Sequence, residues 1–130
     1  MALTLTTSTT VTVQDTAQNI NIQQAKTVVD ATANLNFVVE TYNLAAAQST
    51  YQLISVGDID VLQDIFMIVT SKTAGTFAGV SLSLTAGAGA EVLKLWDSLT
   101  LTGRIAGLAL KNLDPTNPVT VTVILGGTNA

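Results

Sequence analysis

The chain contains no histidine and no cysteine among its 130 residues. Histidine is the commonest general base near neutral pH, and the cysteine thiolate is a common nucleophile in catalysis. Without them the chain also lacks the imidazole and thiolate ligands of zinc and has no means of forming disulfide bonds. The sequence therefore does not predict an enzyme, and it contains no motif for a cofactor.

Charge is also scarce, because only 11% of the residues are charged, against about one quarter in ordinary soluble domains. The net charge is −4, and the five basic residues are scattered along the chain, which disfavours binding to nucleic acid. They are Lys26, Lys72, Lys94, Arg104 and Lys111. The mean hydropathy of +0.48 is high for a free monomer, so we expect a homo-oligomer that buries much of its surface.

Long hydrophobic runs are missing as well. The longest apolar run, Ile65–Val69, is far shorter than the roughly 18 residues that a membrane-spanning helix needs. The sequence therefore predicts no membrane span.

The clearest positive signal is the alternation of apolar and polar residues, strongest in the last third of the chain, between Ser98 and Gly127. Side chains of a strand point to opposite faces in turn, so this pattern predicts a β-meander. Val119, Val121 and Val123 share one face of its closing strand and are expected to seal a core. The loop between Asp114 and Pro118 precedes that strand.

Shorter alternating segments fill the rest of the chain, at residues 34–44, 51–56, 76–84 and 91–96. The segment Asp64–Thr70 is apolar on both faces, which predicts a central strand covered from both sides. Residues 1–13 are rich in threonine and predict either a first strand or an extended N-terminal arm that adds to a neighbour's sheet edge. For residues 14–33 strand and loop are favoured over a short helix.

These segments predict an all-β fold: a single-domain antiparallel β-sandwich or jelly roll of about eight strands over residues 1–130. No composition break marks a second domain.

Two groups of residues are candidates for a site. Asp58, Asp60 and Asp64 are the only carboxylate cluster and are weak candidates for a hard cation, because the full calcium-loop pattern is missing. Trp96 is the lone tryptophan and is a candidate either for a sugar-stacking platform or, as we favour, for a core or subunit-interface anchor.

The second half of the chain resembles the small β-sandwich or jelly-roll proteins of tailed bacteriophage particles. The resemblance rests on Gly57-Asp-Ile, the run from Asp64 to Lys72, the TFAGVSLSL segment and the closing LTLTGRIAGLALKNLDPTNPVTVTVILGG segment. It identifies no catalytic position. In the N-terminal half only the threonine-rich, charge-poor character is shared.

The resemblance implies a virion structural protein, most simply a capsid decoration or cement protein that binds across capsomers on the phage head. It implies a homo-oligomer, with a trimer favoured, held by anchors such as Phe66, Trp96 and the terminal valine row. Its partner would be the major capsid protein or another virion protein, contacted through loops or the N-terminal segment. The expected location is the capsid surface, after assembly in the host cytoplasm.

Two alternatives stay open at this point. One is a structural module of the tail, baseplate or fibre. The other is a carbohydrate- or receptor-binding β-module that presents Trp96.

Overall fold

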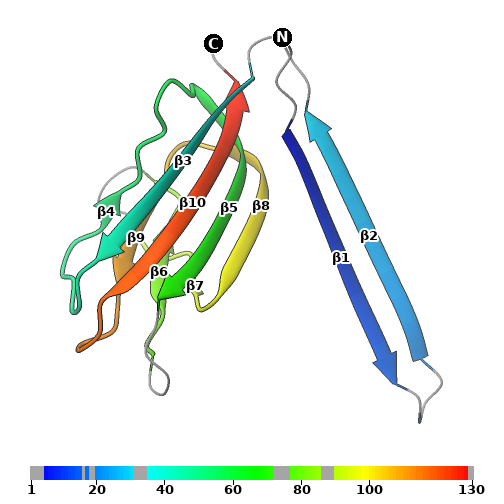
Figure 1. The fold of residues 1–130 in the computed structure, drawn as a ribbon, viewed down its shortest axis with the longest axis horizontal. Coiled ribbons are helices and arrows are strands. Elements are labelled where there is room, and N and C mark those ends of the chain that lie inside the picture. Colours follow the sequence, from blue (N-terminus) through cyan, green and yellow to red (C-terminus); the bar gives the residue numbers. More distant parts are fainter. Residues whose placement is uncertain are drawn as a thin grey trace. The chain divides into compact units, whose positions relative to one another are not determined.

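The computed structural model describes residues 5–15, 17, 20–30, 35–71, 77–85 and 90–128. Every regular element in these residues is a β-strand (Figure 1), which confirms the predicted all-β class. None of the described residues belongs to a helix long and apolar enough to cross a membrane. The chain divides into two compact units, Met1–Leu35 and Asn36–Ala130.

The first unit is a two-stranded antiparallel ribbon of β1 (Leu5–Asp15) and β2 (Ile20–Asp30). Its register runs without a shift from the Leu5–Asp30 pair to the Asp15–Ile20 pair. The segment 1–13, for which the sequence predicts an arm or a first strand, contributes its described residues to β1. The preference for a strand over a helix in residues 14–33 is confirmed by β2.

The second unit is an eight-stranded β-sandwich. Its strands are β3 (Leu35–Leu44), β4 (Gln52–Leu53), β5 (Val61–Ser71), β6 (Val80–Ser83), β7 (Leu93–Leu95), β8 (Ser98–Ile105), β9 (Ala109–Asn112) and β10 (Val119–Thr128). One sheet has the order β3-β10-β5-β8 and the other the order β4-β9-β6-β7. We call them the first and the second sheet.

The strand order is that of a jelly roll. The eight strands pair as a nested hairpin, the first with the last: β3 with β10, β4 with β9, β5 with β8 and β6 with β7. Contacts of β10 with β5 and of β9 with β6 then join these pairs into two four-stranded sheets. This winding is the eight-stranded, double-Greek-key arrangement.

The core lies between the two sheets and is built from alternate positions of their strands. The first sheet contributes Ile65 and Met67, together with Val119, Val121, Val123 and Leu125; the second contributes Val80, Leu82 and Leu110. All of these side chains are at most 2% exposed. The predicted role of Val119, Val121 and Val123 in sealing the core is therefore confirmed.

Two expectations need correction. β5 is central, between β10 and β8, but the described strands of the sandwich cover only its inner face, because Phe66 and Ile68 remain 38% and 37% exposed. The strand predicted at residues 51–56 is only two residues long. Beyond its end, the backbone N–H of Ile54 donates to the Leu108 carbonyl at 3.0 Å and that of Ser55 to the Tyr42 hydroxyl at 2.9 Å.

Candidate functional site

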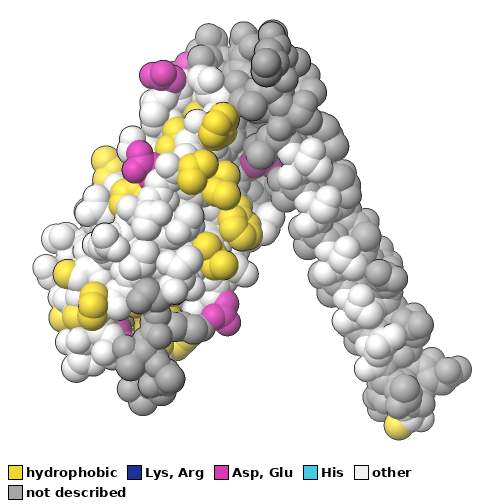
Figure 2. Space-filling model, viewed as in Figure 1, with side chains coloured by type: hydrophobic (Ala, Val, Ile, Leu, Met, Phe, Trp, Pro, Cys, Tyr) yellow, Lys and Arg dark blue, Asp and Glu magenta, His cyan; other side chains and the backbone are white. Residues whose placement is uncertain are grey.

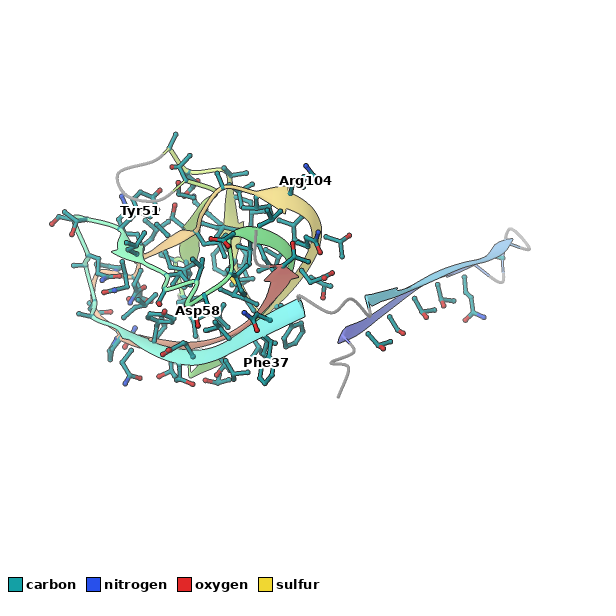
Figure 3. The ribbon with its side chains drawn as sticks, turned by 90° about the horizontal axis from the view of Figure 1, so that it is seen from above. Phe37, Tyr51, Asp58 and Arg104 are labelled. Carbon is teal, nitrogen blue, oxygen red and sulfur yellow. The ribbon has the colours of Figure 1, made fainter. Side chains whose placement is uncertain are left out.

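The outer face of the first sheet carries a group of exposed apolar side chains, which we call the outer patch. Its members are Phe37 and Val39 on β3, Ile124 on β10, and Phe66 and Ile68 on β5. Phe37 and Val39 are 57% and 55% exposed, and Ile124 is half-buried. Figure 3 shows Phe37 projecting from β3 away from the second sheet. None of these residues belongs to the buried core of the sandwich.

The strand register makes the outer patch continuous. Ile124 lies directly opposite Phe66, and Thr122 lies opposite Ile68. On β3, the Thr41 hydroxyl lies 3.5 Å from that of Thr122, so Val39, two residues before Thr41 in the antiparallel pair, lies beside Ile124. Neighbours directly opposite on adjacent strands have Cβ atoms about 5 Å apart, so their side chains touch.

Threonine and serine border the outer patch on β8, where Thr100 pairs with Phe66 and Ser98 pairs with Ile68. Figure 2 shows hydrophobic side chains in a band along this face, with the visible Asp and Glu side chains at its margins. An apolar centre with an uncharged hydroxyl rim is typical of a protein-binding surface and offers no chemistry for catalysis.

Trp96 forms a second exposed apolar feature, at the end of β7. Its ring is 49% exposed and meets Phe77 edge to face, with ring centroids 5.6 Å apart and an interplanar angle of 87°. It lies over Gly79, whose φ of +95° favours glycine and where an added Cβ would come within 3.4 Å of Trp96 Cε2. The ring is thus packed against Phe77 and Gly79, while about half of the residue faces solvent.

Two lysines flank the strand next to Trp96 on the second sheet. Ser81 pairs with Lys94 on β7 and with Lys111 on β9. The Tyr51 hydroxyl lies 2.7 Å from Ser81 Oγ, and Lys111 Nζ lies 4.8 Å from the centroid of the Tyr51 ring. Positive charge, hydroxyl groups and an exposed indole therefore occupy the same sheet.

The predicted carboxylate cluster does not form a joint site. Asp58 and Asp60 are exposed in the loop before β5, where Figure 3 labels Asp58, whereas Asp64 is 6% exposed within β5. In the described part of the chain no three acidic side chains come close enough to hold a metal ion.

A buried polar network lies at one end of the sandwich, and it stabilises loops. Asn112 is fully buried, and its Nδ2 donates to the backbone oxygens of Ala45 at 3.1 Å and Asn117 at 2.8 Å, while its Oδ1 accepts from Asp114 N at 2.9 Å. Because Nδ2 reaches both the segment after β3 and the loop before β10, one side chain fixes two connections.

Asp114 closes the same loop. Its Oδ1 accepts from the backbone N–H groups of Thr116 and Asn117, each at 2.9 Å. These backbone hydrogen bonds, that of Thr116 first, lower the pKa of Asp114 below its ordinary 3.8, although burial acts in the opposite direction. The ionised carboxylate is therefore part of the folded loop.

Among the predicted anchors, the valine row of β10 lies in the core, whereas Phe66 and Trp96 lie on the surface. Neither Phe66 nor Trp96 is a core anchor, and their role at a subunit interface stays a prediction. The sequence analysis did not single out Phe37 or Val39. A signal was present, since β3 carries apolar residues on both of its faces.

No protein-family model matches the chain, and no curated protein and no solved structure is significantly similar to it.

Proposed function

We propose that the protein is a non-enzymatic structural component of a virus particle: a capsid decoration protein that binds across the capsomers of a phage head. The jelly-roll topology supports this proposal by analogy, because viral capsid proteins use the fold. The same fold also serves lectins and enzymes, so the analogy alone does not carry the argument.

The observation that carries the proposal is the outer patch. A soluble monomer rarely exposes a contiguous apolar surface of more than a few hundred Å² without a partner. Phe37 alone is 57% exposed. A phenylalanine has a surface of about 200 Å², so burying this exposed part against a partner contributes about 3 kcal/mol at 25 cal/mol per Å². The chain thus has a strong driving force for association at a surface without catalytic groups.

The mechanism that follows is binding energy alone. Subunits associate through the outer patch, with a trimer favoured, and the loops at the ends of the sandwich contact the major capsid protein. Each contact across the joint between two capsomers buries additional surface, and internal pressure must expose that surface again to separate the capsomers. The protein acts on the capsid surface after assembly in the host cytoplasm.

Particle fractionation tests this proposal. Heads and tails are separated from disrupted virions, and the protein is quantified in each fraction with an antibody. We expect it in the head fraction at a fixed ratio to the major capsid protein. Recovery with tails would favour a tail, baseplate or fibre module, and absence from purified particles would refute a virion role.

A second candidate function is carbohydrate binding at Trp96. A half-exposed indole that packs on Phe77 offers a flat face on which a sugar ring stacks, and Lys94 and Lys111 on the same sheet favour a glycan with negative charge. Binding to a glycan array should be lost with Trp96→Ala and retained with the matched control Val92→Ala, which removes an exposed apolar side chain nearby. Equal binding by both variants would rule this function out.

A further inference from the structure

We propose that the outer edge of β8, the side that faces away from β5, pairs with β8 of a second copy of this chain. The two strands run antiparallel about a two-fold axis, so that two first sheets join into one. This contact uses the backbone at a sheet edge and is distinct from association through the outer patch. It rests on the proposed function for its setting, a lattice on which copies lie close together.

Among the described edge strands of the sandwich, β8 is the long one without a feature that discourages pairing. The sheets end on β3 and β8 and on β4 and β7, of which β4 and β7 have only two and three residues. β3 carries the exposed Glu40 on the row of Val38 and Tyr42 that packs against the core. Short strands and inward-facing charges are devices that protect a sheet edge. β8 has eight residues and contains neither charge nor proline before Arg104.

The backbone of β8 presents hydrogen-bonding groups on its outer side. The N–H of Val69 on β5 donates to the carbonyl of Asp97, the residue before β8, at 2.7 Å. Bonded and non-bonded pairs alternate along an antiparallel ladder, and Ser98 belongs to the next pair. The N–H and C=O groups of Ser98, Thr100 and Thr102 therefore point away from β5. No described strand pairs with β8 on that side.

The inward row of β8 is only partly covered. Leu99, Leu101 and Ile105 pack against the core but remain half-buried. On the neighbouring β5, the inward-facing Ile65 and Met67 are at most 1% exposed. A strand added beside β8 would cover its leucines as β8 covers the inward row of β5. Pairing thus buries apolar surface in addition to forming hydrogen bonds.

The sequence of β8 is complementary to itself, which favours a second copy as the partner. In a pair centred on Thr100, Leu99 lies opposite the second copy's Leu101 on the core side. On the outer side Thr100 meets Thr100 and Ser98 meets Thr102, so hydroxyl groups face hydroxyl groups and no like charges meet. These are the residues whose backbone groups point outward, so each of these pairs exchanges two hydrogen bonds. A contact of one surface with itself is closed by a two-fold axis.

The small size of the contact makes it weak in free solution. The paired stretch from Ser98 to Thr102 is about 17 Å long, and the edge of two stacked sheets is about 10 Å wide. The two copies together bury about 400 Å², well below the roughly 1,200 Å² of a stable interface. Copies held side by side on a particle have a high effective concentration, which offsets this weakness. The contact would then link neighbouring copies along the capsid surface.

Cross-linking tests the edge and its register, because the natural chain has no cysteine. Full-length Ser98→Cys and Thr102→Cys chains with different tags are co-expressed and treated with a short bismaleimide at increasing protein concentration. In the proposed register these two positions lie opposite each other, about 5.5 Å apart. Two copies of either position alone are offset by four residues, about 13 Å. We therefore expect the covalent heterodimer to exceed either homodimer.

Thr100→Pro in both tagged chains separates edge pairing from any other contact. Proline removes the N–H that points to the partner and leaves the ladder with β5 intact, as it does on natural edge strands. The heterodimer should fall to the level without reagent, whereas the matched control Thr100→Ala should retain it. Urea unfolding shows whether the proline variant is folded. If it is not, Thr100→Lys replaces it, because this change places two like charges directly opposite each other.

Three outcomes would overturn the proposal. A heterodimer that persists with Thr100→Pro or Thr100→Lys would show that the link comes from another face, and homodimers of equal yield would show a different register. No link at any protein concentration would show that the edge does not pair, as when the ribbon of the same chain covers it. Particle fractionation of the natural chain measures location and not this contact, so the proposed function stands or fails separately.

Discussion

At the scale of single residues, Asn112 is the side chain on which the loop end of the sandwich depends. Replacing it by alanine leaves the Asp114 N–H and the Ala45 and Asn117 carbonyls without their partner. Because these groups are buried, Asn112→Ala should lower the free energy of unfolding by about 3 kcal/mol in urea denaturation. The control Asn43→Ala removes one exposed contact with Thr120 and should cost less than about 1 kcal/mol. Equal losses would contradict this role.

Asp114 gives the fold a defined response to acid. Its pKa is lowered in the folded state by the backbone N–H groups of Thr116 and Asn117, so its ionised form stabilises the native chain. That stability is fully present above the ordinary pKa of 3.8 and is lost as the pH falls through the lower folded-state value.

Urea unfolding at a series of pH values measures this response. Between neutral pH and pH 2 to 3, Asp114→Asn should lose less stability than the natural chain, and at neutral pH it should be the less stable of the two. Parallel pH curves for the two proteins would show that this carboxylate does not contribute to the acid response.

Residue-scale features were predictable from the sequence only where polar residues mark the outer face of a strand. Thr120 and Thr122 mark it on β10, so the inward direction of Val121 was read correctly. In β5 every position from Ile65 to Val69 is apolar, and nothing in the sequence says that Phe66 faces outward. Asn112 was missed because its link to Ala45, which joins two distant connections, lies 67 residues away, although its partners Asp114 and Asn117 are close in the sequence.

At the scale of elements, β10 depends on a close approach at Gly127. A Cβ there would overlap the Val61 carbonyl oxygen and come within 2.6 Å of Ile59 Cγ2. Gly127→Ala should therefore lower the free energy of unfolding by about 1–3 kcal/mol, because the neighbouring strand must shift. The control Thr122→Ala, on the outer face of β10, should change it by less than about 0.5 kcal/mol. A neutral Gly127→Ala would show that the contact is absent.

Elements were predictable where their local pattern is strong. Alternation located β3, β8 and β10, and the Ile20–Ile22 pair indicated β2. Pairing in the sandwich was not predictable, because pairs such as β3 with β10 and β4 with β9 join strands far apart in the sequence.

At the scale of the whole molecule, the composition and the structure point to the same conclusion. A chain with 11% charged residues and a mean hydropathy of +0.48 covers its core and still leaves Phe37, Val39, Phe66 and Ile68 on one sheet face. The sequence predicted β5 to be covered on both sides, and among the described strands the second sheet covers one of them. Association would supply the missing cover.

The solution mass of the natural chain, measured by light scattering across a range of concentrations, tests the account most directly. We expect an oligomer, with three subunits of 13.5 kDa favoured, and dissociation to 13.5 kDa for the Phe37→Ser/Phe66→Ser variant. Thr100→Ser, on the rim of the outer patch, should keep the natural mass. A natural chain of 13.5 kDa at every concentration, or a double variant with unchanged mass, would contradict the account.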